Sequence, residues 1–128
     1  PTRRSSDLLS PLDAPVVKES LLDAGAREVD AETVESARIL NARPLYGVDI
    51  TDTTLPQETR LSHALHFNKG CYLGQEIVER IRSRGHVNKV LGRIELDGEP
   101  TAETGTVTSR TVDPRTGRTV VLAYHRPA

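Results

Sequence analysis

The sequence contains no methionine or tryptophan, and its 128 residues include one cysteine, one phenylalanine and three tyrosines. A single cysteine excludes an internal disulfide, so we expect a reducing, cytoplasmic location. No apolar run approaches the roughly 18 residues of a membrane helix and no signal peptide is recognisable, so we expect no membrane partner. Leu, Ile, Val and Phe account for 32 residues. This exceeds the share of about 20% below which chains stay disordered, so a packed core is expected.

The first residues show neither helical nor strand periodicity. We interpret residues 1–14 as an artefact or a disordered tail and exclude them from the fold prediction. The absence of methionine indicates a piece of a larger protein.

Charge is unevenly distributed, although the net charge is only −1. That value argues against nucleic-acid binding through bulk charge alone. Residues 69–93, however, carry six basic and two acidic side chains, which is the first indication of a surface that faces an anion.

Two helices are expected in the first half of the chain. Residues 15–24 begin with a proline and are followed by Gly25, which are typical start and stop signals. A second helix begins at Asp30 and ends before Pro44. The apolar faces expected for the two helices comprise Val17, Leu21 and Leu22 in the first and Val34, Ala37 and Leu40 in the second. Residues 45–54 are expected to be irregular, residues 56–60 to form a loop and residues 65–67 a brief strand.

The second half changes from helical to strand periodicity. Residues 73–83 predict a helix that ends at Gly85, with an apolar face of Leu73, Ile77 and Ile81 beside Val78, and an ion pair between Glu76 and Arg80. Residues 90–97, 104–110 and 119–124 predict strands, the last two joined by a turn at residues 113–117. Helices followed by antiparallel strands predict an α+β fold.

Residues 69–76, Lys-Gly-Cys-Tyr-Leu-Gly-Gln-Glu, are named here the cysteine segment. Cys71 is expected near a helix N-terminus and next to Lys69, and both features favour the thiolate form of a reactive cysteine. The alternative is a small buried residue at a tight junction between Gly70 and Gly74.

Polar residues after the cysteine allow two interpretations. Gln75 and Glu76 are either exposed residues of a first helical turn or acceptors for the N–H groups of a heterocycle. Arg80 and Arg84 share a helical face and, with Lys89, form either a solvated face or a contact for a polyglutamate tail or RNA phosphates.

We predict no intrinsic metal site. His63, His66, Cys71 and His86 match no common ligand spacing, and one cysteine cannot hold an iron–sulfur cluster alone. Phosphate-binding loops, dinucleotide fingerprints and nucleophile elbows are absent from the sequence.

The cysteine segment resembles the motif of the YgfZ proteins, folate-binding relatives of the glycine cleavage T protein. Four further segments are similar to that family in the same order: residues 38–39, 45–49, 55–58 and 84–88. The resemblance extends over residues 15–128.

The resemblance implies a fold in two parts. Residues 15–86 would be the last part of an aminomethyltransferase-like, folate-binding body, and residues 87–128 a small, incomplete antiparallel β-barrel lobe. Since the half that supplies most folate contacts would be absent, we expect the chain to be inactive by itself.

The resemblance also implies a function: folate-dependent assembly or maintenance of iron–sulfur clusters. The cofactor would be tetrahydrofolate or a one-carbon derivative, and the partners would be iron–sulfur client enzymes such as the radical enzyme that thiomethylates tRNA. Cys71 would be the functional thiol. Residues that would bind folate or face a partner are Lys69, Gly70, Tyr72, Gly74, Gln75, Glu76, Arg38, Tyr46 and Gly47.

Two alternatives remain open. One is a tetrahydrofolate-dependent aminomethyltransferase, an enzyme in the strict sense; the T proteins that perform this reaction lack the Lys-Gly-Cys-Tyr motif. The other is a module that contacts tRNA directly and weakly, against which stands the lack of an aromatic stacking platform.

Overall fold

The fold is described from a computed structural model that places residues 11–66, 68, 70–85 and 87–127. The chain divides into two compact units, Pro1–Ala31 and Glu32–Ala128. The predicted division between residues 86 and 87 remains a prediction, and the proposed tail at residues 1–14 lies mostly outside the described residues. None of the helices in the described residues is long and apolar enough to span a membrane.

The first unit contains helix α1 (Ala14–Asp23), as the sequence predicts. Pro15 lies in its first turn, and Gly25 ends it with a φ of +91°. The amide of Gly25 donates to the carbonyl of Leu22 and that of Ala26 to Leu21, which is a Schellman motif. No residue of α1 is buried, so its predicted apolar face is not packed within this unit.

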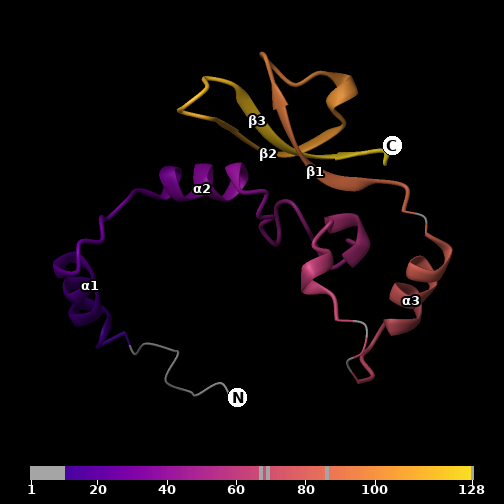
Figure 1. The fold of residues 1–128 in the computed structure, drawn as a ribbon, viewed down its shortest axis with the longest axis horizontal. Helices are drawn as coiled ribbons and strands as arrows, with labels where there is room; N and C mark the ends of the chain where they lie inside the picture. Colours follow the sequence, from indigo (N-terminus) through magenta and orange to yellow (C-terminus); the bar gives the residue numbers. More distant parts are fainter. Residues whose placement is uncertain (1–10, 67, 69, 86, 128) are drawn as a thin grey trace. The chain divides into compact units, whose positions relative to one another are not determined.

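The second unit is built on an antiparallel sheet of three strands, β1 (Val90–Leu96), β2 (Thr106–Val112) and β3 (Thr119–His125). Figure 1 shows β3 between the other two. All three strands were predicted, and the predicted turn at residues 113–117 joins β2 to β3. The described residues therefore form an α+β fold with an open, three-stranded antiparallel sheet. This confirms the predicted fold class.

The core lies where helix α2 (Ala31–Leu40) packs on this sheet. Ile39 contacts a cluster of buried residues from β1 and β3, namely Leu91, Val120 and Leu122. The predicted apolar face of α2 is wrong in part: Val34 is 57% exposed, whereas Ile39 is 1% exposed. The reason is tertiary, since the sheet contacts the side of the helix that carries Ile39 and Arg38.

Helix α3 (Gln75–Arg84) begins after Gly74 and ends at Gly85, both in the left-handed conformation. Val78 of this helix is buried, whereas Leu73 and Ile77 of the predicted face are exposed. The side-chain amide of Gln57 donates to the Val78 carbonyl at 2.8 Å, which attaches α3 to the preceding segment. An ion pair on the helix joins Arg82 to Glu79, not the predicted Glu76 to Arg80.

Two short 3₁₀ helices precede α3: η2 (Pro56–Thr59) and η3 (Ser62–Ala64). The predicted loop at residues 56–60 is therefore mostly helical, because Glu58 caps the amide of Leu55 and Pro56 presets the first turn. The predicted strand at residues 65–67 is wrong for residues 65 and 66, and Phe67 lies outside the described residues.

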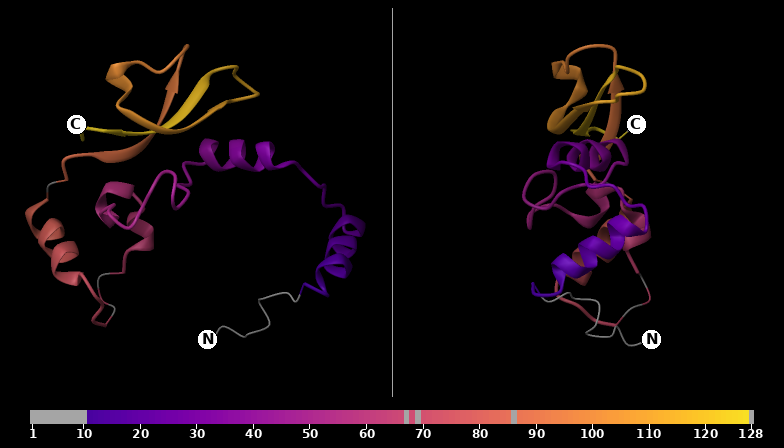
Figure 2. Two further views of the ribbon diagram at one scale, coloured as in Figure 1. Left: turned by 180° about the vertical axis from the view of Figure 1, so that it is seen from behind. Right: turned by 90° about the vertical axis from the view of Figure 1, so that its left-hand side faces the viewer.

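The segment between β1 and β2 includes a third short helix, η4 (Ala102–Thr104). Figure 2 shows this segment beside the strands from two further sides. It approaches β3 closely at Gly105, whose φ is +92°. A Cβ atom at this position would lie 2.1 Å from the carbonyl oxygen of Tyr124, so only glycine fits here.

We expect Gly105→Ala to destabilise the chain more than Gly98→Ala does. Both glycines have a positive φ, but a Cβ atom at Gly98 meets nothing within 4 Å, so its substitution adds backbone strain alone. The additional clash at Gly105 costs about 1–3 kcal/mol. Urea unfolding of the two variants measures this difference, and equal free energies of unfolding would contradict the close approach.

Candidate functional site

A network of polar side chains surrounds the buried carboxylate of Asp49. The loop after α2 turns back on itself through hydrogen bonds from the amides of Val48 and Asp49 to the carbonyl of Leu45, at 3.2 and 2.9 Å. This turn directs the Asp49 side chain, which is 0% exposed, toward α2 and β2. Its Oδ2 accepts hydrogen bonds from Arg38 Nη1 at 2.5 Å and from the Leu45 amide at 2.8 Å.

Strand β2 contributes two hydroxyl groups to the same carboxylate. Thr108 Oγ1 and Ser109 Oγ donate to Oδ1 of Asp49 at 2.5 and 2.6 Å. Successive side chains of a regular strand point to opposite faces, but the register with β3 shifts between Val107 and Ser109. This β-bulge lets two neighbouring hydroxyls meet one carboxylate.

Arg38 uses all of its donors within the chain. A guanidinium group has five N–H groups. Two donate to the carboxylate of Glu35, and the other three to Asp49, to the Arg43 carbonyl at 2.7 Å and to Ser109 Oγ at 2.8 Å. In this arrangement a folate contact by Arg38 would require an acceptor to leave, most readily Glu35, whose side chain is 47% exposed.

The network sets the ionisation of its members. Burial by itself raises the pKa of Asp49, but the hydrogen bonds from Ser109, Thr108, the Leu45 amide and Arg38 outweigh it and hold that pKa below its usual range. The hydrogen bond to Arg38 also lowers the pKa of Glu35. The pKa of Arg38 is raised, chiefly because its guanidinium group donates a hydrogen bond to Glu35. The network therefore holds its ions charged.

Tyr46 and Gly47, predicted as folate contacts, lie at the outside of the same loop. Tyr46 is 69% exposed. Gly47 has a φ of +86° and donates its amide to the Ile50 carbonyl at 2.7 Å. The loop thus presents an aromatic ring to solvent above a rigid turn, and a role of either residue in folate binding stays a prediction.

Most of the described residues of the cysteine segment are exposed, whereas Gly74 and Gln75 are partly buried. Cys71 is a free, exposed thiol, so the alternative of a small buried residue is wrong. Gly70 and Glu76 are also exposed, and Tyr72 is 38% exposed. Lys69 lies outside the described residues. The thiol is therefore accessible to a partner or reagent, whereas its chemistry remains a prediction.

Gln75 has a local role at the start of α3. Its side-chain oxygen accepts a hydrogen bond from the backbone amide of Tyr72 at 3.3 Å. The backbone amide of Gln75 donates to the Tyr72 carbonyl, also at 3.3 Å. Gly74 precedes it with a φ of +84°, which closes this turn. Gln75 thus stabilises the segment that carries Cys71, and contact of Gln75 or Glu76 with a heterocycle stays a prediction.

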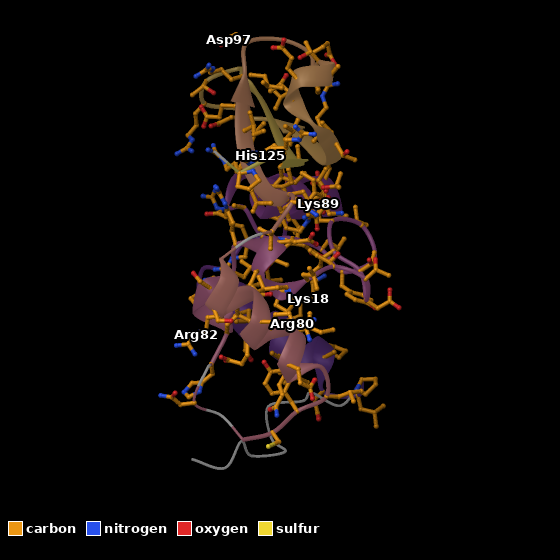
Figure 3. All side chains as sticks on the ribbon, turned by 90° about the vertical axis from the view of Figure 1, so that its right-hand side faces the viewer. Lys18, Arg80, Arg82, Lys89, Asp97 and His125 are labelled. Atoms are coloured by element: carbon orange, nitrogen blue, oxygen red, sulfur yellow. The ribbon has the colours of Figure 1, made fainter. Side chains whose placement is uncertain are left out.

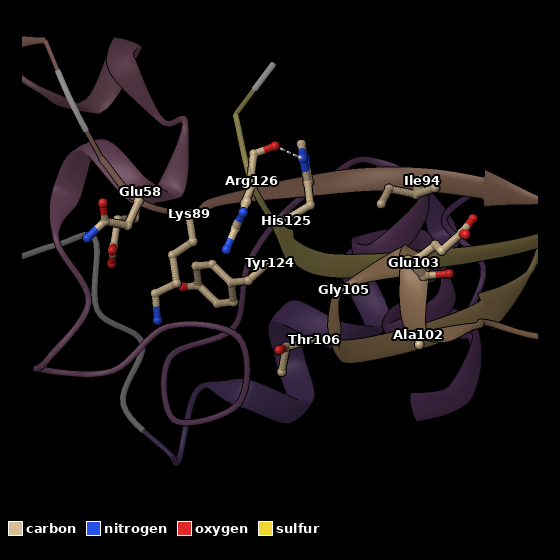
Figure 4. Close-up of a pocket in the computed structure, with 12 residues that line it drawn as sticks. Glu58, Lys89, Ile94, Ala102, Glu103, Gly105, Thr106, Tyr124, His125 and Arg126 are labelled. Atoms are coloured by element: carbon tan, nitrogen blue, oxygen red, sulfur yellow. Dashed lines mark hydrogen bonds between the residues drawn. The ribbon is translucent and has the colours of Figure 1, made fainter.

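Lys89 lies in a cavity of about 880 Å³ at one end of the sheet. Its ammonium nitrogen is 4.6 Å from the ring centroid of Tyr124, a distance typical of a cation–π contact. Figure 4 shows Glu58 on the same side of the cavity as Lys89, and Ala102 and Glu103 at the other end. Both signs of charge line the cavity, so it lacks the cationic character of an anion site.

The other predicted anion contacts do not join Lys89 in that cavity. Figure 3 shows Lys89 near His125 of β3, whereas Arg80 and Arg82 extend from α3. Arg80 is exposed. The Arg84 side chain lies outside the described residues. Arg80 therefore does not line the cavity that contains Lys89, and a joint anion contact of Arg80, Arg84 and Lys89 stays a prediction.

Metal-ligating side chains do not gather in the described part of the chain. The described residues contain no group of three or more His, Cys, Asp or Glu side chains that could hold an ion. Since His86 lies outside them, the assembly of His63, His66, Cys71 and His86 is not fully tested.

Comparison with known proteins finds similarity to aminomethyltransferases. No family model matches it. It is 33% identical to an aminomethyltransferase of Rubrobacter xylanophilus over 93% of this chain and 35% of that protein. Aminomethyltransferases of Rippkaea orientalis and a Nostoc species are 30% and 32% identical, each over 82% of this chain and 31% of the relative. The chain is a distant homologue of the aminomethyltransferases.

The similarity covers the C-terminal region of the aminomethyltransferases. The chain spans about a third of the length of the relatives that it matches. This supports the aminomethyltransferase part of the predicted resemblance, and leaves the narrower resemblance to the YgfZ proteins untested.

The acceptor that organises this region, Asp49, carries little signal in the sequence. Asp49 stands in the segment at residues 45–49, but it received no role. Its position between Val48 and Ile50 is a weak signal of burial. The sequence does not indicate that Thr108 and Ser109 bind Asp49, because this contact depends on the β-bulge in β2.

We expect Asp49→Asn to lower the free energy of unfolding by about 3–5 kcal/mol, since it leaves the Arg38 guanidinium without its buried partner. Glu35→Gln is the matched control. That side chain is about half exposed, so its loss should cost about 0–1 kcal/mol. Chemical unfolding measures both, and similar values would show that Asp49 does not organise the network.

The stability of the chain should fall in acid. The folded pKa of Asp49 is lowered from an unfolded value of about 3.9. Its contribution to stability is therefore fully present above the unfolded pKa, and is lost as the pH falls through the lower folded pKa. Unfolding measured between about pH 6 and pH 2 should show this loss. Asp49→Asn should flatten the profile, and an unchanged slope in that variant would contradict the assignment.

Proposed function

We propose that the chain is the C-terminal part of a protein that transfers an aminomethyl group, with tetrahydrofolate as the acceptor of the one-carbon unit. Similarity to aminomethyltransferases over 82–93% of the chain carries this proposal. It is the alternative that the sequence left open, and it is supported more strongly than an iron–sulfur role. A cytoplasmic location is part of the same proposal.

The described residues by themselves do not build a folate pocket. The donors of Arg38 are all engaged inside the chain. Tyr46 and Cys71 are exposed, and neither lines the cavity around Lys89. We therefore assign no step of the reaction to this chain alone. The Asp49 network would hold the loop with Tyr46 in place, and contacts to folate would involve further parts of the protein.

A second candidate is the folate-dependent maintenance of iron–sulfur clusters in client enzymes, including a tRNA-thiomethylating enzyme. The specific observation that favours it is the exposed thiol of Cys71 in the cysteine segment. A thiol on an accessible turn can reach a client protein or a sulfur donor. In this hypothesis the thiol of Cys71 is required, whereas the aminomethyl transfer of the first proposal gives it no role.

Expression of the complete gene that encodes this chain, in two bacterial strains, distinguishes the candidates. One strain lacks its glycine cleavage T protein, and the other lacks its YgfZ protein. For an aminomethyltransferase, the wild type and Cys71→Ser should both restore glycine cleavage. For an iron–sulfur maintenance factor, the wild type should restore thiomethylated tRNA and Cys71→Ser should reduce it at least about tenfold.

Thr53→Ser is the control substitution, because Thr53 is exposed and serine keeps its hydroxyl. Thr53→Ser should match the wild type in both strains. Soluble protein that restores neither activity would overturn both candidates. Restoration of thiomethylated tRNA by Cys71→Ser would overturn the role of the thiol.

A further inference from the structure

A separate cavity lies where the residues after α2, the end of η2 and η3 face strand β1. Its volume is about 290 Å³, close to the lower limit of about 300 Å³ for small-molecule pockets. The lining includes apolar and basic residues: Ala42, Leu61, Leu91, Arg60, His63 and Arg93. None of the residues predicted to contact folate or an anion lines it, and neither does Cys71.

The apolar part of the lining is continuous with the core of the second unit. Leu91 belongs to the core cluster under α2 and remains 5% exposed. Leu61, which follows η2, is partly buried, and Ala42 lies just beyond the end of α2. An apolar group that enters the cavity would leave water for this lining, which favours binding.

The charge of the lining has one sign. Three basic residues line the cavity, and no acidic residue of the described chain does. Arg93 pairs with Glu95, its neighbour on the same face of β1. Arg60, by contrast, makes no ion pair or side-chain hydrogen bond with the residues that the structure describes. The unpaired guanidinium beside the cavity is therefore that of Arg60.

The backbone at two lining residues is in a conformation that favours glycine. Ala42 and Arg60 have φ values of +52° and +56°, and they are the non-glycine residues of the described chain with a positive φ. The helix ends impose this conformation, since Ala42 follows α2 and Arg60 follows η2. Such residues are held by the structure around them, and they cluster at ligand sites. The Arg60 side chain thus extends from a backbone that is fixed at the cavity.

We propose that this cavity binds a short apolar monocarboxylate, either a medium-chain fatty acid or an arylacetic acid. The single negative charge would pair with Arg60, since a guanidinium binds a carboxylate through two parallel hydrogen bonds. His63 would donate a further hydrogen bond, because an imidazole carries at least one N–H. The apolar body would lie on Leu61 and Leu91. This site is apart from Cys71 and does not depend on the proposed function.

Titration calorimetry of the full chain with octanoate and with phenylacetate tests the proposal. We expect a dissociation constant of about 1 mM or tighter for at least one of them, and the acid that binds more tightly identifies the source of the carboxylate. The corresponding amides lack the charge and acetate lacks the apolar body. Each of these controls should bind at least about tenfold more weakly.

Substitutions locate the site. Arg60→Gln should weaken binding of the preferred acid about tenfold or more, because it removes the paired donors. Arg43→Gln is the matched control, since Arg43 is exposed and follows Ala42 but does not line the cavity; its affinity should equal that of the wild type. Circular dichroism establishes that each variant folds. Methyl chemical shifts of Leu61 and Leu91 should change on titration, which locates the site without any substitution.

Three results would overturn the proposal. The first is that neither acid binds at concentrations well above 1 mM. The second is an affinity for the amides or for acetate equal to that for the acids, which would leave either the charge or the apolar body unrecognised. The third is an unchanged affinity in Arg60→Gln, or an equal loss in Arg43→Gln, which would indicate that Arg60 does not hold the carboxylate.

Discussion

The carboxylate of Asp49 is the point at which α2, the loop after it and β2 meet, since each provides at least one donor to its two oxygens. Removing such a group from water is expensive, and only a full set of hydrogen bonds offsets the cost. Asp49 has that set. The backbone of the same residue also accepts the hydroxyl of Tyr124 at 2.9 Å. The loop is therefore attached to β2 through its side chain and to β3 through its main chain.

This attachment determines the roles of the residues around Asp49. Arg38 resembles a ligand-binding arginine by its place in the sequence, yet its five donors support the fold. An arginine held in this way is rigid, and it fixes the loop that presents Tyr46. The residue thus acts as a positioning group in this chain, and its one partly exposed partner, Glu35, is where an outside acceptor could enter.

The cysteine segment lies in the more loosely packed part of the second unit, around η2, η3 and α3. Here Val78 is buried, whereas Leu73 and Ile77 are exposed. The hydrogen bond from Gln57 to Val78 is one of the contacts that hold α3 to η2. Segments with few buried contacts open at low cost, and binding groups often lie on such segments. This part therefore presents an accessible thiol, while the sheet supplies the stable support.

The sequence by itself determined the three helices, the three strands and their turn, because proline, glycine and apolar periodicity act over a few residues. Its short motifs in a fixed order also predicted a resemblance to the YgfZ proteins, of which the broader relationship to aminomethyltransferases is supported. Tertiary structure decided which face of α2 is buried: Ile39 packs on the sheet and Val34 does not, although both are apolar. It also decided the partners of Arg38 and Asp49, since a bulge in β2 brings Thr108 and Ser109, about sixty residues away in the chain, to one carboxylate. Contacts of this kind depend on how strands register and where a helix docks, and no local pattern of residues encodes them.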